Sequence, residues 1–214
     1  MNLYRELTQV PARAAGGRRL LAVVPGLVTN NQDPDNLGRV KVSFPWLAEA
    51  EESAWARLVS PVAGAQRGLF WLPEVGDEVL LAFEHGDPGR PYILGGLWNG
   101  VDTPPTDAGD GRDVRVLKTR SGHLVRLDDS DGAEKIEIVD KSGGNSIVVD
   151  TAANTITLSS GQDIQLKAPQ GKILLEAQEV QVKSSADTKV EAGGGLTIQA
   201  SGSLTVKGST VMIN

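Results

Sequence analysis

Residues 135–166 read KIEIVDKSGGNSIVVDTAANTITLSSGQDIQL. In this stretch two aliphatic residues are one position apart, polar and Gly or Ser residues follow, and then another such pair begins. The alternation within each pair predicts a β-strand with one apolar face and one polar face. From Ile156 onward the pairs mostly recur every seven to nine residues, a short period that is typical of repetitive β structure.

The composition of the chain changes near residue 100. All nine aromatic residues lie in the first 98 positions, and ten of the eleven prolines lie in the first 105. The tract that follows contains no aromatic residue, so the change predicts two structural parts rather than one. We expect an N-terminal arm over 1–19, a barrel domain over 20–100, a linker over 101–112 and the repetitive tract over 113–214.

Charge and composition exclude several classes of protein. The net charge is −6, so non-specific nucleic-acid binding is not expected. The chain contains no cysteine, hence no disulfide and no thiolate metal site. Arg18-Arg19 precedes an apolar run that ends at Pro25, shorter than the roughly 7–15 residues of a signal-peptide core. We therefore expect assembly in the cytoplasm without a signal peptide.

The first part predicts a small all-β barrel. Strands are expected over 20–28, 38–44, 54–60, 76–83 and 92–98, with a short acidic turn over 46–55. Five strands in a domain of this size match an OB-fold barrel. We expect its aromatic side chains to lie in the core and at the contact with the second part.

A single repeat of the second part lacks the energy to fold alone. Burying two aliphatic side chains contributes about 3–6 kcal/mol. Ordering about eight residues costs about 12 kcal/mol. One chain can coil into a wide solenoid, or several chains can bring their apolar residues to a common axis. The sequence shows no coil-length repeat of the size that a solenoid requires, which favours the second arrangement.

We therefore expect an intertwined trimeric β-helix, or β-prism, in which each chain supplies one strand in turn. Gly143-Gly144, Gly161, Gly171 and Gly193–Gly195 are expected at its corners with positive φ. The expected axis residues are Ile136, Ile138, Ile147, Val149, Ile156, Leu158, Ile164, Leu166, Ile173, Leu175, Val180, Val182, Leu196, Ile198, Leu204, Val206, Val211 and Ile213.

Three motifs of the barrel domain carry a family resemblance. They comprise Gly38, Arg39 and Val40; Pro73, Glu74, Val75, Gly76, Asp77 and Glu78; and Gly86, Asp87, Pro88, Arg90 and Pro91. Their order and spacing resemble the OB domain of the phage baseplate assembly protein V and VgrG spike family. Residues 118–123, followed by Leu127-Asp128-Asp129, are similar to the entry of that family's spike, and residues 206–214 resemble its end.

The resemblance implies a homotrimeric central spike of a contractile tail or injection system, which pierces a target cell envelope mechanically. The implied partners are two further copies, the baseplate hub, the tail tube through that hub, and the envelope. A PAAR-like tip protein would dock on Thr210, Val211, Met212, Ile213 and Asn214. The particle would be a phage tail or an extracellular injection machine.

The sequence shows no catalytic constellation, so we expect no enzyme, no cofactor and no metal. His85 and His123 are expected to be structural or solvent-facing. Asp128, Asp129 and Asp131 favour a strand end and turn over a cation site. One alternative is an OB-fold module that binds a glycan or single-stranded nucleic acid, fused to a monomeric β-solenoid; another is a polysaccharide-degrading solenoid enzyme.

Overall fold

The computed structural model describes residues 22–45, 52–108 and 112–213. The expected arm over 1–19, most of the acidic turn over 46–55 and Asn214 lie outside the described residues. The chain divides into two units, one up to Gly161 and one over Gln162–Asn214, and each is described by itself.

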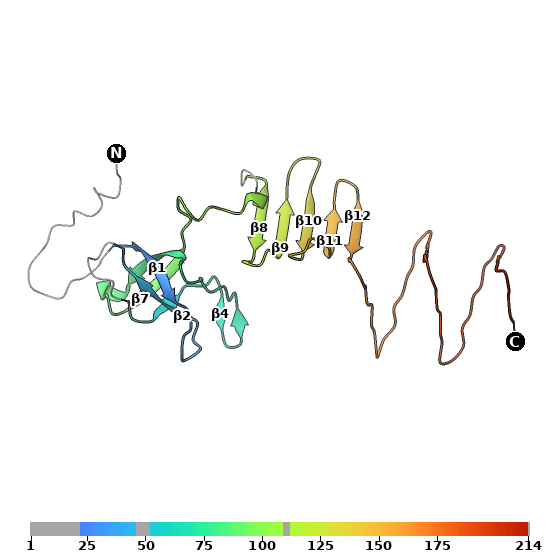
Figure 1. Ribbon diagram of the computed structural model, residues 1–214, viewed down its shortest axis with the longest axis horizontal. Helices are drawn as coiled ribbons and strands as arrows, with labels where there is room; N and C mark the ends of the chain where they lie inside the picture. Colours follow the sequence, from blue (N-terminus) through green and yellow to red (C-terminus); the bar gives the residue numbers. More distant parts are fainter. Residues whose placement is uncertain (1–21, 46–51, 109–111, 214) are drawn as a thin grey trace, which may run out of the picture. The chain divides into compact units, whose positions relative to one another are not determined.

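The first unit begins with a closed five-stranded barrel, drawn in blue to green in Figure 1. Its strands are β1 (Val24–Asn30), β2 (Arg39–Ser43), β3 (Ala56–Leu58), β6 (Glu78–Phe83) and β7 (Pro91–Gly96). The order around the barrel is β1-β2-β3-β7-β6, and β6 pairs with β1 to close it. All pairs are antiparallel except β3 with β7. The prediction of an all-β fold with a five-stranded OB-like barrel is confirmed.

Alternate residues of the strands fill the barrel core. Val40 and Val42 of β2 are fully buried, as are Val79 and Leu81 of β6. The buried core also includes Val28, Ala56, Phe83 and Ile93. The aromatic residues were expected in the core and at the contact with the second part, and among those described two belong to the core or pack against it. Phe83 is buried and Phe44 packs against the core, but Phe70, Trp71 and Trp98 are exposed.

Three short elements were not expected from the sequence. A small hairpin joins β4 (Ala63–Gly64) to β5 (Arg67–Gly68), with Gln66 at φ 55° in its turn. Two 3-10 turns are also present: η1 (Glu84–Gly86) directly follows β6, and η2 (Thr106–Ala108) precedes the second sheet.

A single-layer antiparallel sheet completes the first unit. It contains β8 (Val114–Lys118), β9 (Leu124–Asp128), β10 (Lys135–Val139), β11 (Ser146–Asp150) and β12 (Thr155–Ser159). Each strand pairs with its neighbours in sequence, giving the order β12-β11-β10-β9-β8 (Figure 1). Both edges of β9, β10 and β11 are therefore occupied by strands of the same chain. The expected alternation of strands from different chains is wrong for these three strands, because short turns pair each of them on both sides with its neighbours in sequence.

Three of the four turns of this sheet contain glycine where the backbone is left-handed, and the turn between β11 and β12 has Asn154 there, at φ 54°. Gly122, Gly132 and Gly143 have φ of 100°, 72° and 73°. Gly143 was expected in this conformation. The same expectation is wrong for Gly144, Gly161, Gly171 and Gly193–Gly195, none of which has a φ in that region.

Residues 162–213 of the second unit contain no helix and no strand (Figure 1). The chain is extended there, and nearly every side chain is exposed. Among the described residues, the structure has no helix of the length and apolar character that a membrane crossing requires.

Candidate assembly interface

One face of the sheet is almost entirely aliphatic. The strand registers place Leu117, Val125, Ile138, Ile147 and Leu158 side by side in one row across all five strands. A second row contains Arg115, Leu127, Ile136, Val149 and Ile156. Since side chains two residues apart share a face, both rows lie on the same side of the sheet. We call these ten residues the apolar face.

The apolar face lies open in the described structure. Its leucines and isoleucines are between 43% and 75% exposed. A sheet normally buries its apolar face against another layer, and contiguous exposed apolar surface of this kind marks an interaction site. The six axis residues that the sequence predicted between Ile136 and Leu158 all belong to this face.

The opposite face of the sheet carries most of its charged side chains, in pairs, together with aliphatic ones such as Val116, Leu124 and Val148. Arg126 Nη2 of β9 lies 2.5 Å from Glu137 Oε2 of β10, and their side chains are 25% and 16% exposed. Lys135 lies between Asp128 and Asp150 in the register. This face is suited to water, so the sheet has one dry side and one wet side.

The twelve expected axis residues of the second unit lie in extended chain rather than in strands. All are between 50% and 92% exposed; they are Ile164, Leu166, Ile173, Leu175, Val180, Val182, Leu196, Ile198, Leu204, Val206, Val211 and Ile213. The expected tip residues from Thr210 to Ile213 are likewise exposed. Such a chain exposes aliphatic side chains and backbone hydrogen-bonding groups together.

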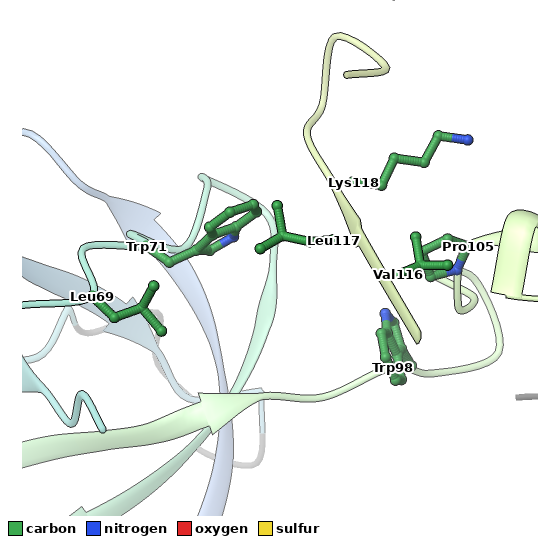
Figure 2. Close-up of a pocket in the computed structure, with 7 residues that line it drawn as sticks. All are labelled: Leu69, Trp71, Trp98, Pro105, Val116, Leu117 and Lys118. Atoms are coloured by element: carbon green, nitrogen blue, oxygen red, sulfur yellow. The ribbon is translucent and has the colours of Figure 1, made fainter. Parts of the chain in front are cut away.

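An apolar cleft of about 410 Å³ lies where the barrel meets β8. It is lined by Leu69, Trp71, Trp98, Pro105, Val116, Leu117 and Lys118. Figure 2 shows Trp71 facing Leu117 on one side of β8, while Val116 and Pro105 lie together on its other side. Part of the expected contact between the two parts is thus made by aromatic side chains.

Two ion pairs also join the barrel and linker to the β8 and β9 region. Arg120 Nη1 lies 2.9 Å from Glu74 Oε2, and Lys118 Nζ pairs with Asp107 of η2. The hydrogen bond from Lys118 holds the pKa of Asp107 below its ordinary value. Glu74 belongs to a barrel motif, which gives that motif a contact beyond the barrel.

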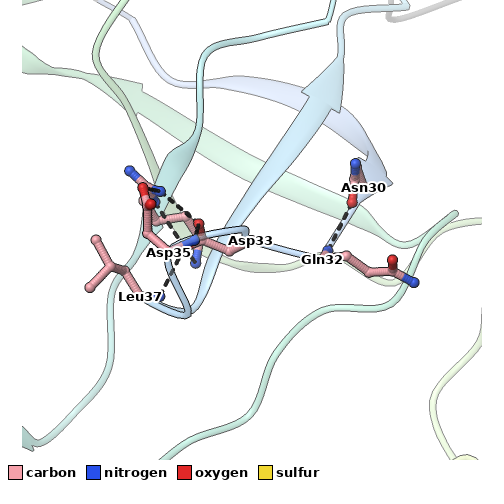
Figure 3. A network of polar contacts seen from close by, with 6 residues as sticks. Asn30, Gln32, Asp33, Asp35 and Leu37 are labelled. Carbon is pink, nitrogen blue, oxygen red and sulfur yellow. Dashed lines mark hydrogen bonds and ion pairs between the residues drawn. The ribbon is translucent and has the colours of Figure 1, made fainter.

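The first barrel motif is anchored by a carboxylate that the sequence reading missed. Arg39 Nε and Nη2 donate to the two carboxylate oxygens of Asp33, at 2.8 and 2.6 Å. The backbone N–H groups of Asp35 and Leu37 also donate to Asp33 (Figure 3). Bonding to Arg39 above all, and to these backbone groups, holds the pKa of Asp33 well below its usual range. In the sequence, the only indication of this ion pair is that an aspartate, Asp33, lies six residues before Arg39.

The other two motifs also shape turns. Asp77 Oδ2 accepts a hydrogen bond from the Glu74 N–H at 2.8 Å, and Gly76 has φ 101° and donates to the Val28 carbonyl. In the third motif, Arg90 pairs with Glu84 at 3.2 Å, and Pro91 begins β7. These motif residues maintain the barrel, and the structure does not gather them into one pocket.

The outer surface of β2, β3 and β7 pairs cations with aromatic rings. Arg39 and Lys41 lie over Trp55, and Arg57 lies over Tyr92, with the charged groups 5.4–5.8 Å from the ring centroids. Asp33, Asp35 and Glu52 form ion pairs with Arg39 and Lys41. The faces of these rings are already covered by the chain's own cations.

The two histidines and the acidic triplet lie in turns. His85 is exposed in η1 with φ 52°. His123 is exposed at the start of β9, where its Nδ1 accepts a hydrogen bond from the Lys141 N–H at 3.2 Å. Asp128 ends β9 and caps the turn by accepting from the Ser130 N–H. In the described part of the chain, no group of three or more His, Cys, Asp or Glu is arranged to hold a metal ion.

Residues 24–98 match the family described as the Type VI secretion system/phage-baseplate injector OB domain. The type VI secretion system spike protein VgrG1a of Pseudomonas aeruginosa is 31% identical over 165 residues, which cover 72% of this chain and 26% of that protein. The spike protein VgrG3 of Vibrio cholerae is 33% identical over 119 residues, which cover 54% of this chain and 11% of that protein. The actin cross-linking toxin VgrG1 of Vibrio cholerae is 31% identical over 117 residues, which cover 53% of this chain and 10% of that protein.

The chain thus spans between about a tenth and about a quarter of the length of these relatives. The matched segments include the barrel motifs from which the resemblance was drawn. The resemblance to the baseplate and VgrG spike family is confirmed.

Proposed function

Since this chain is a VgrG-like protein with an injector OB domain over residues 24–98, we propose that it forms the homotrimeric central spike of a contractile tail or injection system. The observation that carries this proposal is the open apolar face of the β8–β12 sheet. A lone copy leaves that face in water, at a cost of about 25 cal/mol for each Å² of apolar surface. Three copies packed face to face remove it from water.

In this assembly each copy provides one side of a triangular β-prism over residues 114–159. The apolar faces meet at the axis, and the polar faces with Arg126 and Glu137 point outward to solvent. The row residue Ile138 of each copy then approaches its two counterparts. The prism needs no exchange of strands here, because the sheet of each copy is already complete.

Residues 162–213 form the needle by interlacing with the same segment of the other copies. Their extended backbone and exposed aliphatic pairs supply the donors, acceptors and apolar groups that intertwined strands require. Backbone pairing between chains makes such a needle stiff, and its interlacing resists unravelling. The proposed activity is therefore mechanical: the needle transmits force to the target envelope.

The remaining parts of the chain have proposed partners. The barrel domain binds the baseplate hub and through it the tail tube. The segment from Thr210 to Asn214, in which residues 210–213 are exposed, docks a PAAR-like tip protein. We propose no catalytic activity for this chain. The actin cross-linking toxin VgrG1 is matched over 10% of its own length, so its name says nothing about catalysis in the matched segment.

The alternative is an OB-fold module that binds a glycan or single-stranded nucleic acid. Exposed aromatic side chains on the barrel favour it, because bases and sugars stack on such rings. The stacks of Arg39, Lys41 and Arg57 on Trp55 and Tyr92 argue against it, since a ligand must first displace these cations. The alternative predicts a monomer and, for nucleic acid, binding that weakens as salt increases.

Size-exclusion chromatography with light scattering tests the proposal. A particle of three times the 22.6 kDa chain mass is expected; a stable monomer at micromolar concentration would contradict it. A variant without residues 200–214 should still have three times the mass of its own chain. It should no longer bind a PAAR-like protein. Loss of the trimer in that variant would place the main assembly contact in the deleted segment instead of the sheet.

A further inference from the structure

The segment that follows β5 places three large apolar side chains on the outside of the barrel. Leu69, Phe70 and Trp71 are 53%, 75% and 48% exposed. Their backbone is ordered: the Leu69 N–H donates to the Val62 carbonyl at 3.0 Å, and the Ser60 hydroxyl donates to the Leu69 carbonyl at 2.8 Å. The segment is therefore held in place while its side chains remain open, as in a preorganised binding surface.

This segment meets the sheet on its apolar side. Trp71 faces Leu117 (Figure 2). Leu117 is the end member of the row that continues through Val125 and Ile138. The neighbouring Val116 points to the opposite side of β8. The apolar face thus continues without a charged side chain between Leu117 and Trp71, from the sheet onto the barrel domain.

Among the described residues of the first unit, no segment covers this extended surface. The aliphatic pairs of residues 162–213 are themselves exposed and need cover of their own. The other side of the sheet carries the Arg126–Glu137 ion pair and does not continue this surface. A second copy supplies a matching surface, because its own apolar face ends at the same junction of Leu117 and Trp71.

We propose that Leu69 and Trp71, which line the cleft together, form a collar that packs against the same region of a neighbouring copy and closes the barrel end of the apolar interior. This inference rests on the proposed trimer. It adds that the barrel domain contributes side chains to the trimer contact, which would otherwise be confined to the sheet and the needle.

The absence of cysteine in the sequence allows a direct test. Leu69→Cys and Asp131→Cys each introduce one thiol into the full chain; Asp131 lies in the exposed turn between β9 and β10 and is the control. In the assembled protein, maleimide should modify the Leu69→Cys thiol roughly tenfold or more slowly than the control, because reaction requires local opening of the contact. The two thiols should react equally fast in denaturant.

Light scattering on both variants separates the possible results. A trimer in which both thiols react at the same rate overturns the collar and leaves the proposed spike intact. A monomer overturns both. As a second measurement, Trp71→Ala should lower the thermal dissociation midpoint of the trimer, while Val116→Ala, on the other side of β8, should change it less. Equal midpoints for these two variants would also overturn the collar.

Discussion

Ile138 of β10 lies directly opposite Ile147 of β11, and the two side chains are 48% and 43% exposed. Cross-strand aliphatic pairs stabilise a sheet by their mutual contact, yet this pair leaves much of its surface open. The same relationship repeats from β8 to β12, so the sheet is internally paired but not covered.

The first prediction compares two adjacent residues of β11. Ile147→Asp places a carboxylate on the apolar face, where three copies would bring three charges to a dry axis. We expect loss of the trimer, because an unpaired buried charge costs several kcal/mol. Val148→Asp, one residue away, points to the solvent side. We expect this variant to retain the trimer. Light scattering measures the oligomeric state of both variants. A trimeric Ile147→Asp variant would show that Ile147 does not face the axis.

The second prediction concerns the barrel core. Leu81 is fully buried among Val28, Val79 and Ile93. Leu81→Ala should destabilise the barrel by about 2–5 kcal/mol through lost burial and a cavity. Since the sheet is a separate layer, the trimer should still form. Urea unfolding followed by tryptophan fluorescence measures the first effect and light scattering the second; joint loss of both would show that barrel and sheet fold as one unit.

Several elements followed directly from the sequence. Strands were expected over 38–44 and 76–83, and along them the structure buries every second residue, including Val40, Val42, Val79 and Leu81. The aliphatic doublets between Ile136 and Leu158 predicted strands with one apolar side, which the register places in two rows. Period-two alternation reports which side chains share a face, and this is the information that such patterns carry.

Other features depend on tertiary contacts that no local pattern contains. The sequence did not predict that consecutive strands from β8 to β12 pair with each other, because an isolated doublet does not specify its neighbour. Nor did it separate Phe83, which is buried, from Phe70, which is exposed. Aromatic residues occur both in cores and on surfaces, so the residue type alone does not tell whether a given ring is buried. The carboxylate of Asp33 receives five hydrogen bonds in the structure, and the composition of the surrounding loop does not indicate them.

The third prediction is a pH dependence from Asp33. Its pKa is held well below the usual range by Arg39 and by backbone N–H groups. A carboxyl group with a lowered folded-state pKa stabilises the fold above its unfolded pKa of about 4, and this contribution is lost as the pH falls through the folded value. Asp33→Asn should therefore lower the thermal midpoint of the barrel at pH 7. The difference from the unmodified protein should shrink as the pH falls below about 4.

The matched control for this prediction is Asp35→Asn. Asp35 also pairs with Arg39, at 2.6 Å, but its side chain is 66% exposed whereas that of Asp33 is 3% exposed. Exposed ion pairs contribute about 0–1 kcal/mol, so the Asp35 variant should change the midpoint little. Calorimetry at several pH values measures both. A difference for Asp33→Asn that stays constant from pH 7 to about 3 would rule out ionisation as its source.

The fourth prediction isolates the turn between β10 and β11. Gly143 has φ 73°, and a Cβ added there would meet nothing within 4 Å. Gly143→Ala therefore introduces no clash, and its cost is conformational, about 1–2 kcal/mol for an L-residue in the left-handed region. Asn tolerates that region better, so Gly143→Asn should recover part of the loss. Hydrogen exchange of the β10 and β11 amides measures both variants, since opening this hairpin exposes them. If the Ala and Asn variants exchange equally fast, left-handed strain is not the cause, because the two residues differ chiefly in their tolerance of positive φ.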